Sequence, residues 1–182
     1  MPDYGWLFDP KRCIECKACE AACKQWNGVS TGSGIHYRRV HNFVHGVFPR
    51  VRANALSMAC NHCIEATCVK VCPTRAVWRR ADGIVLVQEE KCVGCGLCVK
   101  FCPYEAPQVD QARRKMEKCT MCADRIDAGL QPACASVCPT HALQWGRWDE
   151  ISHQGAAQVE DFSTPVLTKP AIRFVTEPWT PS

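Results

Sequence analysis

Apolar and polar positions alternate only in short stretches of this chain, so short elements are predicted along its length. Tyr4–Phe8 has the two-residue period of a β-strand. Ala18–Trp26 is rich in helix-forming residues and predicts a helix that ends at the following Asn-Gly pair. Residues 29–34, rich in glycine and serine, predict a loop, and residues 36–47 alternate loosely, as a second strand would.

The clearest local signal is a β-hairpin, in which residues 77–80 and 84–87 flank an Ala-Asp-Gly turn. A five-residue phrase also recurs three times, and each copy predicts the end of a helix followed by a turn into a strand. The copies are C-P-T-R-A at 72–76, C-P-Y-E-A at 102–106 and C-P-T-H-A at 138–142. Residues 152–182 contain four prolines, few aliphatic residues and no cysteine. This composition predicts an extended tail that lies on a partner.

Sixteen cysteines among 182 residues dominate the composition, and they fall into four groups of four. The third group and the proline after it have the spacing C-x2-C-x2-C-x3-C-P of a bacterial ferredoxin loop. The first group repeats this spacing without the proline, and the second and fourth widen the middle gap to four and eleven residues. The groups are Cys13, Cys16, Cys19 and Cys23; Cys60, Cys63, Cys68 and Cys72; Cys92, Cys95, Cys98 and Cys102; and Cys119, Cys122, Cys134 and Cys138.

The ferredoxin spacing has a physical reason. Two-residue gaps let three thiolates converge from one tight loop, and Gly94 and Gly96 permit backbone conformations that turn amides toward the sulfur atoms. Cys102 lies too far along the next helical turn to reach the same cluster, so it is expected to bind a neighbouring one. Pro103 ends that helix because it has no amide hydrogen.

If each fourth cysteine serves the neighbouring cluster, the groups must pair. The adjacent second and third groups pair directly, which leaves the first and fourth to pair around them, and no cysteine is left over. This closed count predicts four 4Fe–4S clusters. The predicted ligand sets are Cys13, Cys16, Cys19 and Cys138 (cluster 1); Cys23, Cys119, Cys122 and Cys134 (cluster 2); Cys60, Cys63, Cys68 and Cys102 (cluster 3); and Cys72, Cys92, Cys95 and Cys98 (cluster 4).

Other uses of cysteine fit this pattern less well. Cysteines separated by only two residues cannot easily form a disulfide with each other. Zinc proteins use paired C-x2-C motifs, but they seldom add a third cysteine at the same spacing followed by C-P. A structural zinc-binding protein is therefore the alternative from a different functional class.

The formal net charge of +4 does not indicate a nucleic-acid partner. A cubane with its four thiolates carries about −2, so four clusters would add about −8. No apolar run approaches the roughly 20 residues that span a membrane, and no signal peptide is expected. The protein is expected in the cytoplasm or at a membrane through partners, and in the periplasm only if co-exported with a signal-bearing partner.

The predicted fold class is α+β, with short helices and β-hairpins in two bacterial-type two-cluster ferredoxin units, one inserted in the other. The outer unit comprises residues 1–50 and 110–150 and holds the first and fourth cysteine groups. The inserted unit comprises residues 51–109 and holds the second and third groups. Residues 151–182 form the extended, partner-binding tail.

Two phrases carry a family resemblance: C-N-H-C-I-E-A-T-C-V-K-V-C-P-T at 60–74 and C-V-G-C-G-L-C-V-K-F-C-P-Y-E-A-P-Q at 92–108. With the order of the groups and the four- and eleven-residue insertions, the chain resembles the iron–sulfur electron-transfer (beta) subunits of molybdopterin oxidoreductases, the dimethyl sulfoxide reductase B-subunit family. The resemblance covers roughly residues 4–148. Nitrate reductase relatives carry tryptophan at the position of Cys95 and hold a 3Fe–4S cluster there, so Cys95 implies a full cubane.

The resemblance implies a non-catalytic subunit of anaerobic respiration that conducts electrons from or to a molybdenum- or tungsten-bis-pterin catalytic subunit. It also implies an order, with cluster 1 nearest that subunit and clusters 2, 3 and 4 following. The second redox partner would be a membrane anchor or quinone-reactive subunit, or a soluble carrier. The alternative within redox chemistry is a polyferredoxin subunit of a hydrogenase or tungsten aldehyde oxidoreductase complex.

Several polar residues beside the predicted ligands are candidates for tuning reduction potentials through charge or hydrogen bonds. Each has an equally simple explanation as a solvated polar side chain. No paired carboxylates, nucleophile–base arrangement or phosphate-binding loop predicts catalysis by this chain. The tuning candidates are His62, His141, Lys24 and Lys100, followed by Lys17, Lys70 and Lys118.

Overall fold

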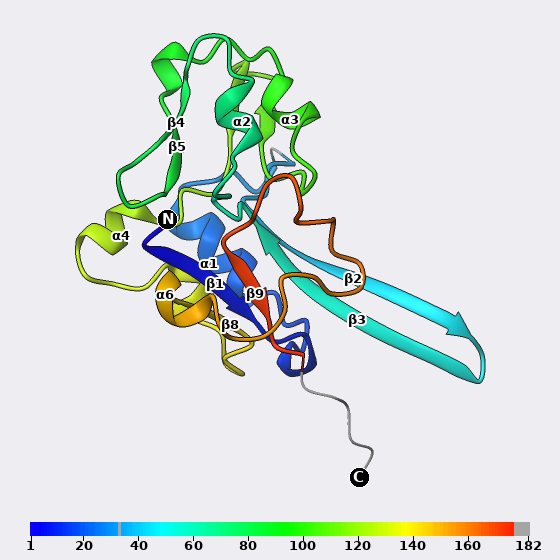
Figure 1. Ribbon diagram of the computed structural model, residues 1–182. Coiled ribbons are helices and arrows are strands. Elements are labelled where there is room, and N and C mark those ends of the chain that lie inside the picture. The colour runs from blue at the N-terminus through cyan, green and yellow to red at the C-terminus, as the bar shows by residue number, and fades with distance from the viewer. Residues whose placement is uncertain (33, 177–182) are drawn as a thin grey trace.

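The computed structural model describes residues 1–32 and 34–176. It is a mixed α/β fold of short helices and small sheets (Figure 1). The strands are β1 Tyr4–Phe8, β2 Arg38–Val47, β3 Arg50–Ala59, β4 Val77–Arg79, β5 Val85–Val87, β6 Gln108–Asp110, β7 Lys115–Glu117, β8 Leu143–Arg147 and β9 Ile172–Phe174. The helices are α1 Ala18–Trp26, α2 Thr67–Lys70, α3 Leu97–Lys100, α4 Ala123–Asp127, α5 Ala133–Ser136 and α6 Trp148–Ile151, with 3-10 turns at Pro10–Arg12 and Glu89–Lys91.

The central sheet has the strand order β8-β1-β9. β1 lies in its middle, antiparallel to β8 and parallel to β9, so that Trp6 pairs with Trp145 on one side and Ile172 on the other. Trp6 and Phe8 are each only 1 % exposed. The predicted strand at Tyr4–Phe8 is confirmed. Both faces of β1 are covered, because Trp6 and Phe8 point into the main core and Leu7 packs against Trp148 and Ile151.

Two groups of elements lie at opposite ends of the body (Figure 1). α2, α3 and the hairpin β4–β5 gather at one end, where α2 packs against α3. α1 packs against α5 near the central sheet. The predicted helix over Ala18–Trp26 and the Asp-Gly hairpin are confirmed. Helices α2, α3 and α5 end just before the three C-P phrases, as predicted.

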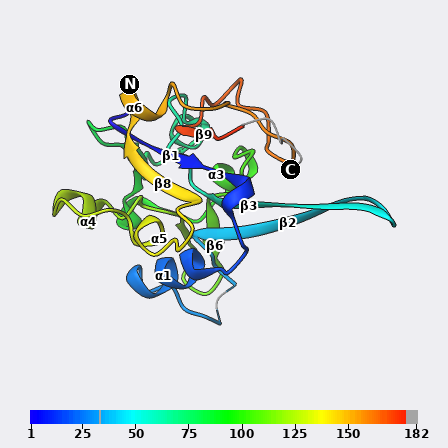
Figure 2. The same cartoon turned by 90° about the horizontal axis from the view of Figure 1, so that it is seen from below.

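A long hairpin, β2–β3, projects from the body (Figures 1 and 2). The sequence predicts its first arm but not β3, because the inner part of β3 is buried on both faces and shows no alternation. The outer part is exposed, with Phe48 87 % accessible at the tip. The predicted boundary between residues 50 and 51 falls at the beginning of β3 and would separate two hydrogen-bonded strands.

The C-terminal segment differs from the prediction in where it lies. β9 completes the central sheet, and Phe174, 0 % exposed, packs against Phe8 and Phe162 with ring centroids 6.5 and 4.8 Å away. A few aromatic residues thus place this segment on the chain's own core, although its aliphatic content is low. Contact with a partner stays a prediction, and residues 177–182 lie outside the described residues.

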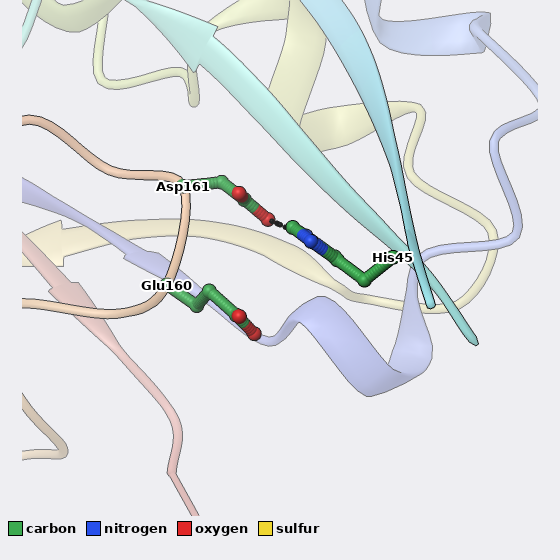
Figure 3. A group of neighbouring side chains, drawn as sticks. All are labelled: His45, Glu160 and Asp161. Carbon is green, nitrogen blue, oxygen red and sulfur yellow. Dashed lines mark hydrogen bonds and ion pairs between the residues drawn. The ribbon is translucent and has the colours of Figure 1, made fainter. Parts of the chain in front are cut away.

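Ion pairs fasten the same segment to the hairpin (Figure 3). His45 Nε2 lies 2.8 Å from Asp161 Oδ2, and Asn54 donates to the same carboxylate. Arg52 pairs with Glu160 at 2.7 Å. His45, Glu160 and Asp161 are close enough to be metal ligands. Because both carboxylates already have cationic or amide partners, this group acts as a clamp between hairpin and segment.

Candidate metal centres

All four cysteine groups begin with the same backbone turn. The residue before the second cysteine has a left-handed φ in every group: 56° at Glu15, 42° at His62, 65° at Gly94 and 57° at Met121. Such turns direct successive backbone amides inward and form an anion-binding concavity. Glycine was expected here only in the third group. The other three groups adopt the same turn with side chains, although left-handed backbone costs such residues about 1–2 kcal/mol each.

Gly94 nevertheless has a reason to be glycine beyond its φ. A Cβ at this position would lie 2.3 Å from the carbonyl oxygen of Arg114. Gly96 has a φ of 75° but no atom within 4 Å of an added Cβ. The hairpin β6–β7 therefore packs directly on the third cysteine loop.

The three C-P phrases also share a backbone turn. The third residue after the cysteine has φ 54° at Arg75, 50° at Glu105 and 52° at His141. In the two C-P-T copies the threonine hydroxyl approaches the cysteine sulfur, at 3.7 Å for Cys72 and 3.8 Å for Cys138. The internal repeat thus extends to the contacts around the sulfur atoms.

The first set of cysteines surrounds one small cavity. Cys13, Cys16, Cys19 and Cys138 line this cavity next to β2 and β3. Ser57 Oγ lies 3.4 Å from Cys19 Sγ. Cys138 is 119 residues away from Cys19 in sequence, so the fold brings the first and fourth groups together here.

A second small cavity is lined by Cys72, Cys92, Cys95 and Cys98. The backbone amide of Met116 donates to Cys92 Sγ at 3.4 Å. Burial raises the pKa of Cys98 to about 11, with further increases from Cys92 and Cys95. The second and third groups therefore meet at this cavity.

The two remaining sets lie between these cavities. Burial is the main reason that the pKa of Cys63 is raised. The charges of three neighbouring thiols raise it further, namely those of Cys60, Cys102 and Cys68. Burial, followed by Cys134 and Cys122, raises the pKa of Cys23 to about 12. Cys119 is fully buried and has Cys23 as its strongest cysteine neighbour. The cysteines of these two sets are thus electrostatic neighbours of one another.

Cysteines of different sets also interact through their charges. These interactions join set 1 to set 2, set 2 to set 3 and set 3 to set 4, which is a linear order. The linking pairs are Cys19 with Cys134, Cys119 with Cys60, and Cys68 with Cys98. The ends of the series reach the surface, where Cys16 and Cys95 are exposed.

The donor set itself tests whether metal fits these sites. None of the sixteen cysteines forms a disulfide, and most lie in groups where burial and neighbouring thiols raise the pKa. Buried thiolates that repel one another need a bound cation to stay deprotonated. Groups of four sulfur atoms around a cavity, with inward amides to offset negative charge, suit iron–sulfur clusters.

Of the residues predicted to tune reduction potentials, two are buried near the cysteine sets. His62 is buried, 1 % exposed, and its Nδ1 accepts a hydrogen bond from the amide of Val85 at 3.0 Å. Burial, and then the charge of Lys118, hold the pKa of His62 well below its usual value. Lys118 is 2 % exposed and donates to the carbonyl of Cys119 at 2.9 Å. These two residues are therefore part of the interior between the cysteine sets.

The other candidates lie at the surface or have structural partners. His141, Lys17 and Lys100 are exposed, although Lys17 borders the cavity of the first set. Lys24 donates to two backbone carbonyls of the loop that follows α1, and Lys70 forms an ion pair of 2.6 Å with a neighbouring glutamate.

Sequence reasoning missed one buried cation, Arg38 at the beginning of β2. It is 3 % exposed and lies beside Cys134, Cys119 and Cys19. Burial alone would lower the pKa of Arg38, but these thiols raise it overall. The signal in the sequence was a basic residue at the beginning of a loosely alternating stretch, which by itself does not predict burial.

Comparisons with known proteins agree with this geometry. Residues 51–148 match the family model described as a 4Fe–4S dicluster domain, and residues 10–26 match a 4Fe–4S binding domain. The B subunit of anaerobic dimethyl sulfoxide reductase from Escherichia coli is 38 % identical over 93 % of this chain and 86 % of its own length. The chain belongs to this family of iron–sulfur subunits.

Other members of the family are comparably similar. The thiosulfate reductase electron transfer subunit PhsB of Salmonella typhi is 44 % identical over 83 % of this chain and 79 % of its own length. The formate dehydrogenase iron–sulfur subunit of Wolinella succinogenes is 39 % identical over 79 % of this chain and 81 % of its own length. The resemblance found in the sequence is confirmed, and the cysteine content and matched domains fit four 4Fe–4S clusters.

Proposed function

We propose that this iron–sulfur subunit conducts single electrons between a molybdenum- or tungsten-pterin catalytic subunit and a second redox partner. The observation that carries the proposal is the linear series of four cysteine sets whose two end members reach the surface. A 4Fe–4S cluster supplies reversible one-electron reduction at each set. The relatives named as subunits of dimethyl sulfoxide reductase, thiosulfate reductase and formate dehydrogenase support a catalytic partner.

The chain's own residues hold and insulate the electron path. The left-handed turns aim amides at the sulfur atoms, and two buried residues of β1 exclude water: Trp6 donates to the Cys60 carbonyl, and Phe8 lines the cavity of the first set. The exposed ends have apolar rims that suit contact with partners. Ile14 is 64 % exposed beside the first set, and Val93 is 59 % exposed beside the fourth.

The ligand assignment is part of the proposal. Each set contains three cysteines of one group and one cysteine of the paired group, as expected of nested ferredoxin units over residues 1–50 with 110–150 and over residues 51–109. The proposed sets are Cys13, Cys16, Cys19 and Cys138; Cys23, Cys119, Cys122 and Cys134; Cys60, Cys63, Cys68 and Cys102; and Cys72, Cys92, Cys95 and Cys98.

The partners are proposed to bind at opposite ends. From the family resemblance we propose that the pterin subunit binds at the Cys16 end, and that a membrane anchor, a quinone-reactive subunit or a soluble carrier binds at the Cys95 end. In the described residues no helix is both long and apolar enough to cross a membrane.

Anaerobic isolation of the native complex tests the function. We expect roughly sixteen irons and sixteen sulfides per chain and a molybdenum or tungsten pterin in the co-purifying subunit. Far fewer irons would refute the four-cluster conductor, colourless zinc-loaded protein would establish the structural alternative, and nickel would indicate a hydrogenase complex.

Substitution of Cys102 by serine tests the ligand assignment. This cysteine belongs to the third group in sequence but is an electrostatic neighbour of Cys60. In Cys102→Ser we expect the electron paramagnetic resonance (EPR) signal of the set containing Cys60 to change or disappear. Loss of the set containing Cys92 instead would show that the sharing scheme is wrong.

A further inference from the structure

Arg38 is held in the interior by three contacts. Its Nη1 donates to the carbonyl oxygen of Ser57 at 3.0 Å and to Ser57 Oγ at 3.2 Å. Its guanidinium lies over the ring of Trp6, 4.6 Å from the centroid. Ser57 Oγ in turn lies 3.4 Å from Cys19 Sγ. The guanidinium is therefore fixed in orientation next to the cysteine sets.

Two of its nitrogen atoms have no partner in the part of the chain that the structure describes. Nε and Nη2 of Arg38 are buried and make no hydrogen bond to any described residue. Buried donors of a charged group are costly when unsatisfied, so an acceptor is expected beside them. The four strongest charge interactions of Arg38 are with cysteines, namely Cys134, Cys119, Cys19 and Cys23.

Three of these cysteines belong to the second ligand set, and one belongs to the first. The sulfur atoms of cluster 2 thus have the strongest charge interactions with Arg38, and those of cluster 1 come next, where Ser57 links Arg38 to Cys19. Hydrogen bonds to cluster and ligand sulfur atoms, together with local positive charge, raise the reduction potential of iron–sulfur clusters.

We infer that Arg38 sets the reduction potential of cluster 2, by placing one permanent positive charge and two N–H donors against its sulfur atoms. The inference rests on the proposed ligand sets. A cluster with four thiolates goes from about −2 to about −3 when it accepts one electron, so an adjacent cation stabilises the reduced form. Arg38 itself exchanges neither electron nor proton, because guanidinium stays protonated in proteins.

The position of Arg38 gives this charge a specific target. β2 and β3 place it between the first two cysteine sets, and no cysteine of the fourth set is among its strongest interactions. A substitution of Arg38 should therefore shift the reduction potential of cluster 2 most, that of cluster 1 less and that of cluster 4 least.

A potentiometric titration followed by EPR, on the anaerobically isolated complex, tests the inference. In Arg38→Met we expect the one-electron reduction of cluster 2 to become at least tenfold less favourable. This change corresponds to a fall in its midpoint potential of about 59 mV. Arg38→Lys keeps the charge without the planar fork, so it should restore part of that shift. Arg52→Met, on the same hairpin but exposed and paired with Glu160, is the matched control and should change no potential.

The outcomes separate this inference from the proposed function. Wild-type complex with far fewer than sixteen irons would contradict the four-cluster assignment. Full iron with unchanged potentials in Arg38→Met would overturn the role of Arg38 alone. If neither Arg38 variant assembles, pulsed EPR of wild-type complex labelled with ¹⁵N-arginine decides: nitrogen coupling to reduced cluster 2 supports the inference, and its absence overturns it.

Discussion

Alanine substitution at two neighbouring glycines separates backbone conformation from steric contact in the third cysteine loop. Gly94 and Gly96 both have left-handed φ values, 65° and 75°, so each alanine carries a cost of about 1–2 kcal/mol. Only at Gly94 does the new Cβ meet another atom, the Arg114 carbonyl oxygen 2.3 Å away. Overpacking of this kind adds about 1–3 kcal/mol.

The clash between a Cβ at position 94 and Arg114 disturbs the surroundings of the ligand Cys92. Arg114 lies in the turn of the hairpin β6–β7, which also provides the Met116 amide to Cys92 Sγ at 3.4 Å and the Lys115 ammonium to the Cys92 carbonyl at 2.7 Å. In Gly94→Ala the hairpin must move away from the new Cβ, and this movement breaks these contacts. The additional cost of about 1–3 kcal/mol raises the population of the opened cysteine loop about 5- to 150-fold.

The assay is iron and sulfide content with EPR of the reduced, anaerobically purified complex. Gly94→Ala should retain roughly twelve irons, with the signal of the set containing Cys92 selectively weakened, and Gly96→Ala should remain near sixteen. Equal iron content in the two variants would refute the steric reasoning. Loss of the set containing Cys60 would contradict the ligand assignment instead.

Three further substitutions test other parts of the structure. Phe174→Ala should destabilise the fold by about 3–5 kcal/mol in a denaturation or proteolysis assay, whereas Leu167→Ala, 82 % exposed, should change it by less than about 0.5 kcal/mol; equal effects would show that the C-terminal segment is not part of the core. Burial alone would raise the pKa of Asp161, but hydrogen bonds from two hairpin side chains hold it below its usual value. Its stabilisation is therefore complete above the unfolded pKa of about 3.9 and lost as the pH falls through the folded pKa. Asp161→Asn should loosen the hairpin in hydrogen exchange at pH 7, with a difference from wild type that shrinks in acid; a pH-independent difference would contradict this. Thr140→Val removes the hydroxyl 3.8 Å from Cys138 Sγ and should lower the potential of the first cluster slightly, and an unchanged potential would show that this contact is inert.

The local elements were predictable because their signals are local. The helix at Ala18–Trp26 and the hairpin over residues 77–87 follow from residue type and turn chemistry. β3 was not predicted, because its inner residues are buried on both faces and show no alternation. β9 was missed because its burial depends on a few aromatic contacts with distant residues.

The turn residues show a similar division. The sequence indicated the left-handed backbone at Gly94 and Gly96, where glycine makes it cheap. It did not indicate the equivalent turns at Glu15, His62 and Met121, where the surrounding fold imposes the conformation on residues that would otherwise avoid it.

The sequence by itself determined the number of thiol ligands, their grouping and hence the class of cofactor, because ligand spacing within a loop is set by local geometry. The family resemblance implied the order of the sets, and tertiary structure alone decided which of them reach the surface. It also decided that Arg38 is the buried cation beside the second set, because burial and unpaired donors arise only when distant strands pack together.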